Sequence, residues 1–130
     1  GYVTSFASGC LYCQAHTILG AERFGCTKKR LEEVWNYANS SAFSNAEKAA
    51  LDFAFAAASV PNKVTEKEVS QLKNYWNDND IVEIMGVIAL FGFLNRWNDS
   101  MGSALEDLPI EKGKKHLAEN TNWTPGKHRV

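Results

Sequence analysis

The sequence predicts an all-α protein, a compact helical bundle, and three observations lead to this prediction. Apolar residues recur at helical spacing through most of the chain, and no useful stretch alternates with a period of two. The pairs Ser44 with Glu47 and Thr65 with Glu68 have the pattern of a capping box at a helix start. Of the 130 residues, 45% are hydrophobic and 12% are aromatic, which is enough apolar side chain to build a core.

Two helical segments are expected at the start of the chain, separated by Gly9. The first is the apolar stretch YVTSFAS, and the second begins near Cys10 with Ser8 as its cap. The second helix should run to Phe24 and stop at Gly25, because glycine readily takes the left-handed conformation past a helix end. The segment SGCLYCQAHT therefore lies at a helix start.

Three further helices are expected in the middle of the chain. Thr27 can cap a third helix, in which apolar residues at 31, 34, 35 and 38 form one stripe. The alanine-rich run AALDFAFAAAS follows Ser44, and its small side chains allow a neighbouring helix to approach closely. Another helix follows Thr65, with apolar residues again at helical spacing.

The longest helix is expected to start near Ile81 and to break near Gly102. It is apolar on every side between 84 and 94, so it should be central or lie in an interface. Its polar end NRWND could line a pocket beside the cysteines or be a solvated helix end. The tail NWTPGKHRV is expected to lie extended along the surface, with His116 and His128 as surface side chains.

Composition excludes several classes of function. The formal net charge is −1, from 14 basic and 15 acidic residues, which argues against a nucleic-acid partner. The longest apolar run, residues 84–94, is much shorter than the ~20 residues of a membrane-spanning helix, so no membrane partner is expected. The 3 cysteines are an odd number and do not make a disulfide framework, which favours the cytoplasm. Residues 1–130 show no linker or repeat and are expected to form a single domain.

Cys10, Cys13 and His16 are the candidate catalytic residues. Cys10, in the first helical turn, is expected to have a lowered pKa because the unpaired backbone N–H groups there favour a thiolate. Cys13 is a helical neighbour of both Cys10 and His16, whereas His16 lies about 240° around the axis from Cys10. His16 can therefore take a proton from Cys13 but not from Cys10.

With a peroxide substrate this arrangement predicts a sequence of steps. The Cys13 thiolate attacks the O–O bond and becomes a sulfenic acid, and Cys10 condenses with it to form a disulfide. A thiol or dithiol reductant then reopens the disulfide by exchange. No cofactor and no metal are expected.

Two other interpretations of the cysteines were weighed. A zinc ion could recruit Cys10, Cys13, His16 and Cys26, but His16 points away from Cys10 on one helix and Cys26 lies beyond the helix end. Alternatively, the cysteines could be small core residues. Cys26 itself has no base near it in sequence and is interpreted as a buried or spare thiol, and Tyr12 as a packing residue.

The segment GCLYCQAHT resembles the C-x-x-C…H motif of the carboxymuconolactone decarboxylase superfamily, in its alkyl hydroperoxidase D-like (AhpD-like) branch. The segments AEKAALDFA, VTEKEVSQLK, IVEIMGVIALFGFLNRWND and WTPGKH follow in the order expected of that branch, so the resemblance covers nearly the whole chain. It implies an all-helical homo-oligomer with peroxidase or thiol–disulfide activity. It also implies that Cys13 is the peroxidatic cysteine and Cys10 the resolving one.

The sequence departs from that branch in two ways. The relay histidine of the branch sits four residues after the second cysteine, where this chain has Thr17, and His16 comes one residue earlier. The glutamate expected about a dozen residues before Cys10 would fall before Gly1. We therefore expect that an N-terminal portion, including a helix and this acid, is missing from the sequence.

The function predicted from sequence is a thiol-dependent peroxidase that acts on hydroperoxides. One alternative is a dithiol–disulfide exchange protein with weak peroxidase activity. Another is a non-catalytic helical oligomer or ligand-binding module. Lactone decarboxylation ranks low, because decarboxylases of the superfamily lack the cysteine pair that is present here.

Overall fold

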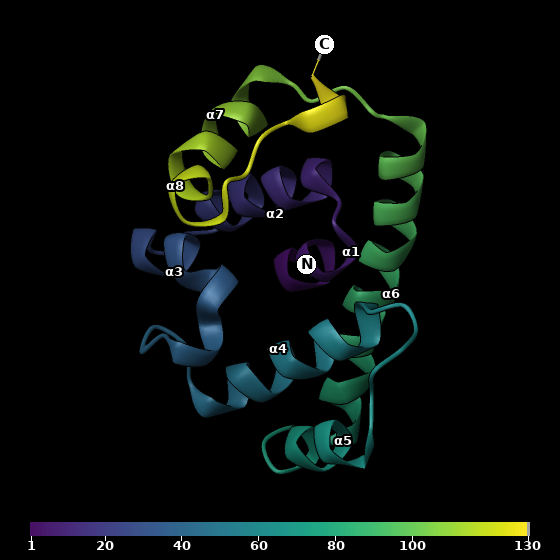
Figure 1. The fold of residues 1–130 in the computed structure, drawn as a ribbon. Coiled ribbons are helices and arrows are strands. Elements are labelled where there is room, and N and C mark those ends of the chain that lie inside the picture. Colours follow the sequence, from purple (N-terminus) through teal and green to yellow (C-terminus); the bar gives the residue numbers. More distant parts are fainter. Residues whose placement is uncertain (130) are drawn as a thin grey trace.

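The computed structural model describes residues 1–129, which form eight α-helices and two short 3₁₀ helices and contain no strand (Figure 1). The all-α prediction is confirmed. The elements are α1 (Tyr2–Ser8), α2 (Leu11–Arg23), α3 (Lys28–Glu33), η1 (Val34–Asn39), α4 (Asn45–Ala58), α5 (Glu66–Lys73), α6 (Asp78–Met101), α7 (Asp107–His116), α8 (Ala118–Thr121) and η2 (Gly126–His128).

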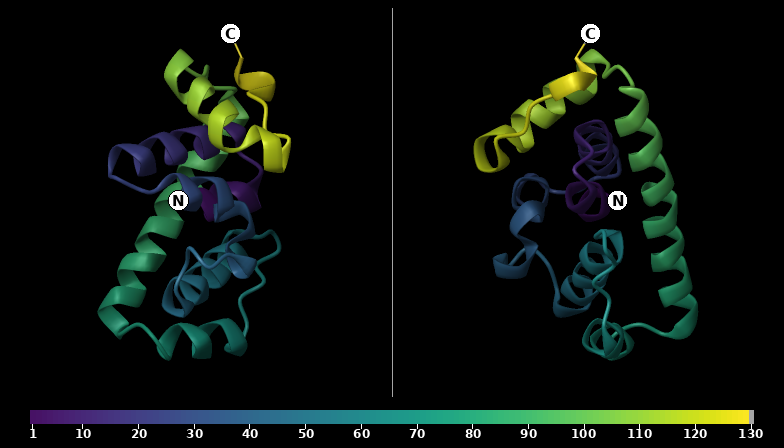
Figure 2. Two further views of the ribbon diagram at one scale, coloured as in Figure 1. Left: turned by 90° about the vertical axis from the view of Figure 1, so that its left-hand side faces the viewer. Right: turned by 45° about the vertical axis from the view of Figure 1, so that its right-hand side comes forward.

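Helix α1 lies near the middle of the bundle and packs against α2, α4 and α6 (Figure 1). The longest helix, α6, runs along one edge of the molecule, as the turned views show (Figure 2). Helix α7 packs along α2, and α8 packs on α7. The C-terminal η2 returns to contact α2.

Several predicted helix starts are confirmed. The Ser44 and Thr65 capping boxes are both formed, and Thr27 accepts a hydrogen bond from the backbone N–H of Arg30 at the start of α3. Helix α6 begins at Asp78, earlier than expected, because Asn77 and the Asp80 side chain form a third capping box.

Two details of the first half differ from the sequence prediction. Ser8 is the last residue of α1 rather than the cap of α2, because Gly9 takes a left-handed conformation (φ 75°) and turns the chain. Cys10 itself then becomes the N-cap of α2. The single helix expected after Thr27 is broken, with a 3₁₀ segment that includes the non-helical Asn36.

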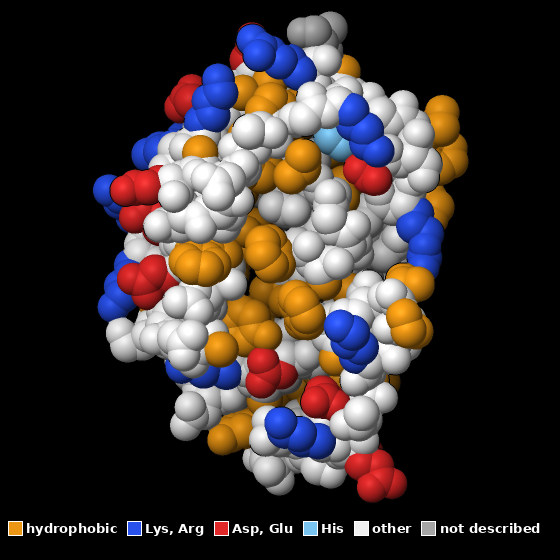
Figure 3. Space-filling view, in the orientation of Figure 1, with side chains coloured by type: hydrophobic (Ala, Val, Ile, Leu, Met, Phe, Trp, Pro, Cys, Tyr) orange, Lys and Arg blue, Asp and Glu red, His pale blue; other side chains and the backbone are white. Residues whose placement is uncertain are grey.

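The core is built mainly from α1, α2 and α4 and the segments that cover them. Its fully buried members include Ile18, Leu72 and Leu117. Hydrophobic side chains also gather in a hollow in the middle of the face drawn in Figure 3, with charged side chains around it. Thr4 and Ser5, both buried on α1, show how tightly the central helix is enclosed.

One of the two sequence interpretations placed helix α6 at the centre of the protein. Within the described chain, α6 is not central. Only Ile88 and Asn95 of this helix are buried. Several of its large apolar side chains are more than half exposed, namely Val82, Leu90, Phe93, Trp97 and Met101. The other interpretation, that α6 lies in an interface, stays a prediction.

The prediction of an extended surface tail is wrong. Trp123 is buried, and its indole N–H donates to the carbonyl of Leu11 at 3.2 Å. Its ring lies against Gly113, where a Cβ atom would come within 2.6 Å of it, so only glycine fits there. The backbone carbonyl of His128 accepts a hydrogen bond from Leu105 N–H at 2.8 Å, which ties the tail to the segment between α6 and α7, and η2 also contacts α2.

The two histidines expected on the surface are also buried. The exposed fractions of His116 and His128 are 3% and 1%. His116 lies within 3.3 Å of Glu22, because α7 packs along α2.

None of the helices within residues 1–129 combines the length and apolar content needed to span a lipid bilayer.

Candidate redox site

The structure places both cysteines at the opening turn of α2. Cys10 is the N-cap, and its Sγ accepts a hydrogen bond from the backbone N–H of Cys13 at 3.3 Å. Both are free thiols, and their exposed fractions are 0% for Cys10 and 3% for Cys13. A sulfur in the N-cap position takes the place of the oxygen that usually satisfies a free N–H at a helix start. This position favours negative charge on Cys10.

The two thiols have opposite pKa shifts, because one donates to the other. Hydrogen bonding from the Cys13 side chain lowers the pKa of Cys10, and burial opposes this effect more weakly. The same hydrogen bond raises the pKa of Cys13, as does its burial. Asn98 donates a hydrogen bond from Nδ2 to the Cys13 sulfur at 3.8 Å, and this bond lowers the pKa of Cys13. In the dithiol form, Cys10 is therefore the more acidic of the two.

His16 lies on α2, and its hydrogen-bond partner is Glu106 rather than Cys13. The distance from His16 Nε2 to Glu106 Oε2 is 3.0 Å, and the Tyr12 ring lies 4.4 Å from the imidazole. Glu106 is the N-cap residue of α7 and is distant from His16 in sequence. No local pattern could have identified it.

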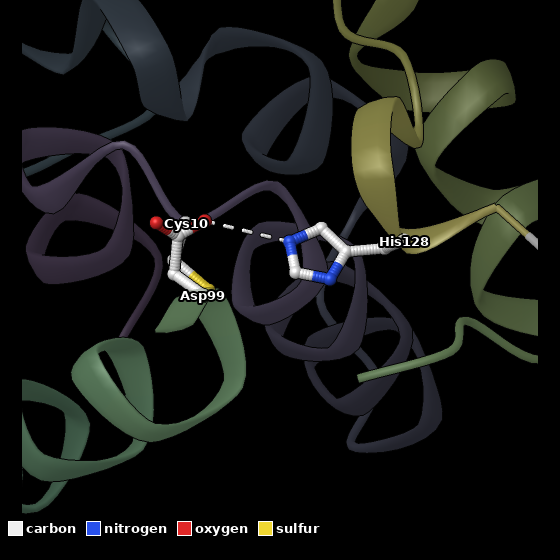
Figure 4. Close-up of side chains that lie close together, drawn as sticks. All are labelled: Cys10, Asp99 and His128. Carbon is white, nitrogen blue, oxygen red and sulfur yellow. Dashed lines mark ion pairs between the residues drawn. The ribbon is translucent and has the colours of Figure 1, made fainter. Parts of the chain in front are cut away.

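A second pair of a histidine and a carboxylate lies on the other side of Tyr12. His128 Nε2 lies 3.5 Å from Asp99 Oδ1, and the His128 ring lies 5.7 Å from the Tyr12 ring. A nitrogen of His128, a carboxylate oxygen of Asp99 and the Cys10 sulfur all lie within 4.8 Å of one another. Figure 4 shows the imidazole reaching from the C-terminal segment toward the other two side chains.

The sequence had given only partial signals for this second pair. The NRWND segment was weighed as a possible pocket lining, and Asp99 of that segment does reach the cysteines. Asp99 also pairs with Lys127, whose Nζ lies 3.1 Å from Asp99 Oδ2. His128 was missed, because nothing local indicated that the tail folds back onto α2.

Zinc is not supported at the residues weighed from sequence. Among residues 1–129, the metal-ligating atoms that converge belong to Cys10, Asp99 and His128, and not to the set with His16 and Cys26. A structural zinc site takes four ligands, and this group offers three. The three side chains bring a thiol, an imidazole and a carboxylate together, and an imidazole next to a thiol can accept its proton.

A cavity of about 930 Å³ opens beside Cys13. Cys13, His16 and Asn98 contribute to its wall, whereas Cys10 does not. Cys26 also lines the cavity as a half-buried thiol. Most of the remaining wall is apolar and includes Phe24, Phe43, Phe91, Phe93, Leu94 and Trp97. A molecule in the cavity would therefore meet Cys13 first.

Comparisons with known proteins agree with this architecture. Residues 2–56 match the family described as the carboxymuconolactone decarboxylase family. The chain is similar to the crystal structure of the apo debrominase Bmp8, with 33% identity and a TM-score of 0.82, over 85% of this chain and 60% of that one. A cysteine-to-alanine variant of Bmp8 in complex with 2,3,4-tribromopyrrole gives 32% identity and a TM-score of 0.84, over 88% of this chain and 61% of that one.

These matches support a likeness to the carboxymuconolactone decarboxylase family over residues 2–56 and an all-α bundle fold like that of Bmp8. No curated protein matches the chain. The chain spans about 60% of the length of each debrominase chain. The activity of the whole protein is therefore a matter for proposal.

Proposed function

We propose that this chain is a thiol-dependent peroxidase of the AhpD-like branch, which reduces hydroperoxides through Cys13 and Cys10. The observation that carries the proposal is a pair of free cysteines in one helical turn, with only Cys13 facing a cavity. Two thiols so placed can close into a disulfide and reopen, and access to the cavity assigns their order.

Cys13 is the thiol that attacks. Its proton passes to His16, which lines the same cavity and is oriented by Glu106 at 3.0 Å. The Cys13 sulfur attacks the terminal peroxide oxygen, the O–O bond breaks, and the leaving alkoxide takes a proton to become an alcohol. The products of this step are a Cys13 sulfenic acid and the alcohol.

Cys10 completes the cycle as the resolving thiol. Its sulfur attacks the sulfur of the Cys13 sulfenic acid, the S–O bond breaks, and water leaves. An external thiol or dithiol then reduces the Cys10–Cys13 disulfide by exchange. The buried position of Cys10 suits this role, because it keeps the second sulfur away from the substrate and close to the first.

The cavity supports an organic hydroperoxide with an apolar body as the substrate class. Aromatic side chains from α6, among them Phe91, Phe93 and Trp97, line the cavity, and a small polar peroxide would leave this apolar surface unused.

Reductive debromination is a second candidate, favoured by the similarity to two structures of a debrominase at 32–33% identity. The apolar cavity would also suit a brominated ring. In this reaction Cys13 would take bromine from a protonated ring carbon, and Cys10 would displace bromide to form the same disulfide. In both reactions the two thiols supply two electrons and end as a disulfide. The reactions differ only in the molecule that accepts the electrons, which is a hydroperoxide or a brominated ring.

Stopped-flow oxidation of the reduced protein distinguishes the two candidates. We expect cumene hydroperoxide to oxidise Cys10 and Cys13 to one intramolecular disulfide, detected by mass spectrometry, with sub-second kinetics. Cys13→Ser should abolish turnover with a dithiol reductant, whereas Cys26→Ser is the matched control and should still form the Cys10–Cys13 disulfide. Release of bromide from 2,3,4-tribromopyrrole without any reaction with hydroperoxide would favour the debrominase and overturn the peroxidase.

A further inference from the structure

We propose that His128, oriented by the Ser103 carbonyl and close to Asp99, is the base that ionises the resolving thiol Cys10, so that each cysteine of the pair has its own histidine. This inference rests on the proposed thiol redox function and deepens it. Its structural basis is the convergence of Cys10, Asp99 and His128 within 4.8 Å (Figure 4).

The position of His128 is built by long-range contacts rather than by local sequence. The hydrogen bond from Trp123 Nε1 to the carbonyl of Leu11 holds the tail on α2, and the hydrogen bond from Leu105 N–H to the carbonyl of His128 holds it on the segment between α6 and α7. Gly126 is left-handed (φ 52°), and a Cβ atom there would come within 2.8 Å of Leu11. These contacts hold the imidazole against the start of α2.

The hydrogen bonds of His128 fix which nitrogen can accept a proton. Its Nδ1 lies 2.8 Å from the carbonyl oxygen of Ser103, which can only accept, so Nδ1 carries the hydrogen in the neutral ring. The free lone pair is then on Nε2. This buried atom has no hydrogen-bond partner among the described residues, although it lies 3.5 Å from Asp99. An unpartnered buried acceptor beside a thiol is arranged to take its proton.

The chemistry of the pair requires such a base after the first step. In the dithiol form the largest cause of the acidity of Cys10 is the hydrogen bond from the Cys13 thiol. Oxidation of Cys13 to a sulfenic acid consumes that thiol. Asp99 alone cannot replace it, because its negative charge raises the pKa of Cys10. A protonated His128 imidazole carries a positive charge, which offsets the repulsion between the Cys10 thiolate and the Asp99 carboxylate.

The resolving step then balances without any further reactant. The Cys10 thiol gives its proton to His128 Nε2, and its sulfur attacks the sulfur of the Cys13 sulfenic acid. The S–S bond forms, the S–O bond breaks, and the leaving hydroxide takes the proton back from His128 to become water. Asp99, 3.5 Å from the same nitrogen, stabilises the imidazolium by its opposite charge while it exists.

Other charged and titratable groups face this cluster and bear on its pH dependence. Lys127 lies 3.1 Å from the second oxygen of Asp99 and partly neutralises it. Tyr12 packs against the His128 ring, and Cys13 is adjacent to Cys10. Among these side chains His128 is the proposed proton acceptor, so replacing it should change the acid limb of the resolving step.

Rapid-mixing kinetics of the full chain can separate the two steps. Sulfenic acid formation on Cys13 is followed by trapping with dimedone, and disulfide closure by mass spectrometry after quenching. We expect His128→Gln to leave sulfenic acid formation within about twofold of wild type and to slow disulfide closure by on the order of 10²-fold, with loss of the acid limb of its pH profile. Asp99→Asn should slow closure less. Lys73→Gln, at an exposed residue at the end of α5, is the control and should change closure by less than about twofold.

A second measurement tests the base even if hydroperoxide is not the substrate. In a Cys13→Ser background, the pKa of Cys10 is measured by thiolate absorbance or by alkylation rate. Adding His128→Gln should raise this pKa, whereas adding Lys73→Gln, at an exposed residue at the end of α5, should leave it unchanged. An unchanged Cys10 pKa, or an unchanged closure rate and pH profile in a folded His128→Gln protein, would overturn the inference. Stoichiometric zinc on Cys10, Asp99 and His128 in the purified wild type would also overturn it. Absence of any hydroperoxide oxidation in wild type, with the Cys10 pKa still dependent on His128, would reject only the peroxidase.

Discussion

Cys10 and Cys13 lie in the same helical turn, but they have different surroundings, which suit them to different steps of the proposed reaction. Cys13 faces the cavity with His16, whereas Cys10 is fully buried beside Asp99 and His128. The sequence spacing was sufficient to identify the cysteine pair, because a helix start and a C-x-x-C motif are local features. The acids that orient the two histidines come from other elements, so spacing could not reveal them.

The hydrogen bond between the thiols leads to a prediction about acidity. Removing the Cys13 thiol removes the main cause of the lowered pKa of Cys10, so Cys13→Ala should raise that pKa and reduce the thiolate fraction near neutral pH. Cys13→Ser keeps a side-chain donor and should raise it less. Thiolate absorbance as a function of pH measures both variants. A Cys10 pKa that is the same in Cys13→Ala as in wild type would show that the thiol–thiol hydrogen bond is unimportant.

At the scale of elements, the α2–α7 contact is held by one acidic side chain. Glu22 on α2 lies 2.8 Å from Lys112 and close to Lys115 and His116 on α7. Hydrogen bonding from Lys112 is the largest cause that lowers the pKa of Glu22 to about 2. This contact supports the catalytic geometry, because α7 also carries Glu106 at its start.

The lowered pKa of Glu22 predicts a pH-dependent loss of stability. The folded state binds the proton more weakly than the unfolded chain, whose carboxyl titrates near 4.5, so the ionised side chain stabilises the fold above that pH. This contribution is lost as the pH falls toward 2. Glu22→Gln should therefore lower the Tm at pH 7, and the difference from wild type should disappear near pH 2. The exposed Glu83→Gln is the control, and an equal Tm for Glu22→Gln and wild type at pH 7 would contradict the prediction.

The exposed apolar face of α6 supports the expectation of a homo-oligomer. A helix that leaves Val82, Leu90 and Met101 more than half exposed has a face wide enough for another copy of the chain. Leu90→Lys should shift the protein toward monomer in analytical ultracentrifugation, because a lysine would be buried without a partner. Tyr75→Lys, at a similarly exposed apolar residue away from α6, should leave the distribution unchanged. A monomeric wild type would reject the expectation.

For the whole molecule, sequence patterns predicted the helices far better than their arrangement. The capping boxes at Ser44 and Thr65 act through neighbouring residues and are local. The burial of Trp123 and His128 depends on the return of the tail to α2 and on the space left by Gly113, which are tertiary features. The same limit applies to the site, since the second histidine belongs to that tail.

The size of the cavity leads to a prediction about substrates. Gly20 lines the cavity, and a Cβ atom there would meet nothing within 4 Å, so a larger side chain can enter without displacing its neighbours. Gly20→Leu should raise the KM for cumene hydroperoxide several-fold and change the rate with hydrogen peroxide by less than twofold. Gly86→Leu, also in open space and outside the cavity, is the control for a glycine replaced within a helix. Equal effects of Gly20→Leu on both peroxides would show that the bulky substrate binds elsewhere.

The central claim is that Cys13 is oxidised to a sulfenic acid and that Cys10 then forms the disulfide with it. Trapping the sulfenic acid tests this claim most directly. Each single-cysteine variant, Cys10→Ser and Cys13→Ser, is treated with cumene hydroperoxide in the presence of dimedone and mapped by peptide mass spectrometry. The account predicts nearly stoichiometric labelling of Cys13 in Cys10→Ser and little labelling of Cys10 in Cys13→Ser. Labelling of Cys10 at the wild-type rate, with Cys13 unreactive, would contradict it.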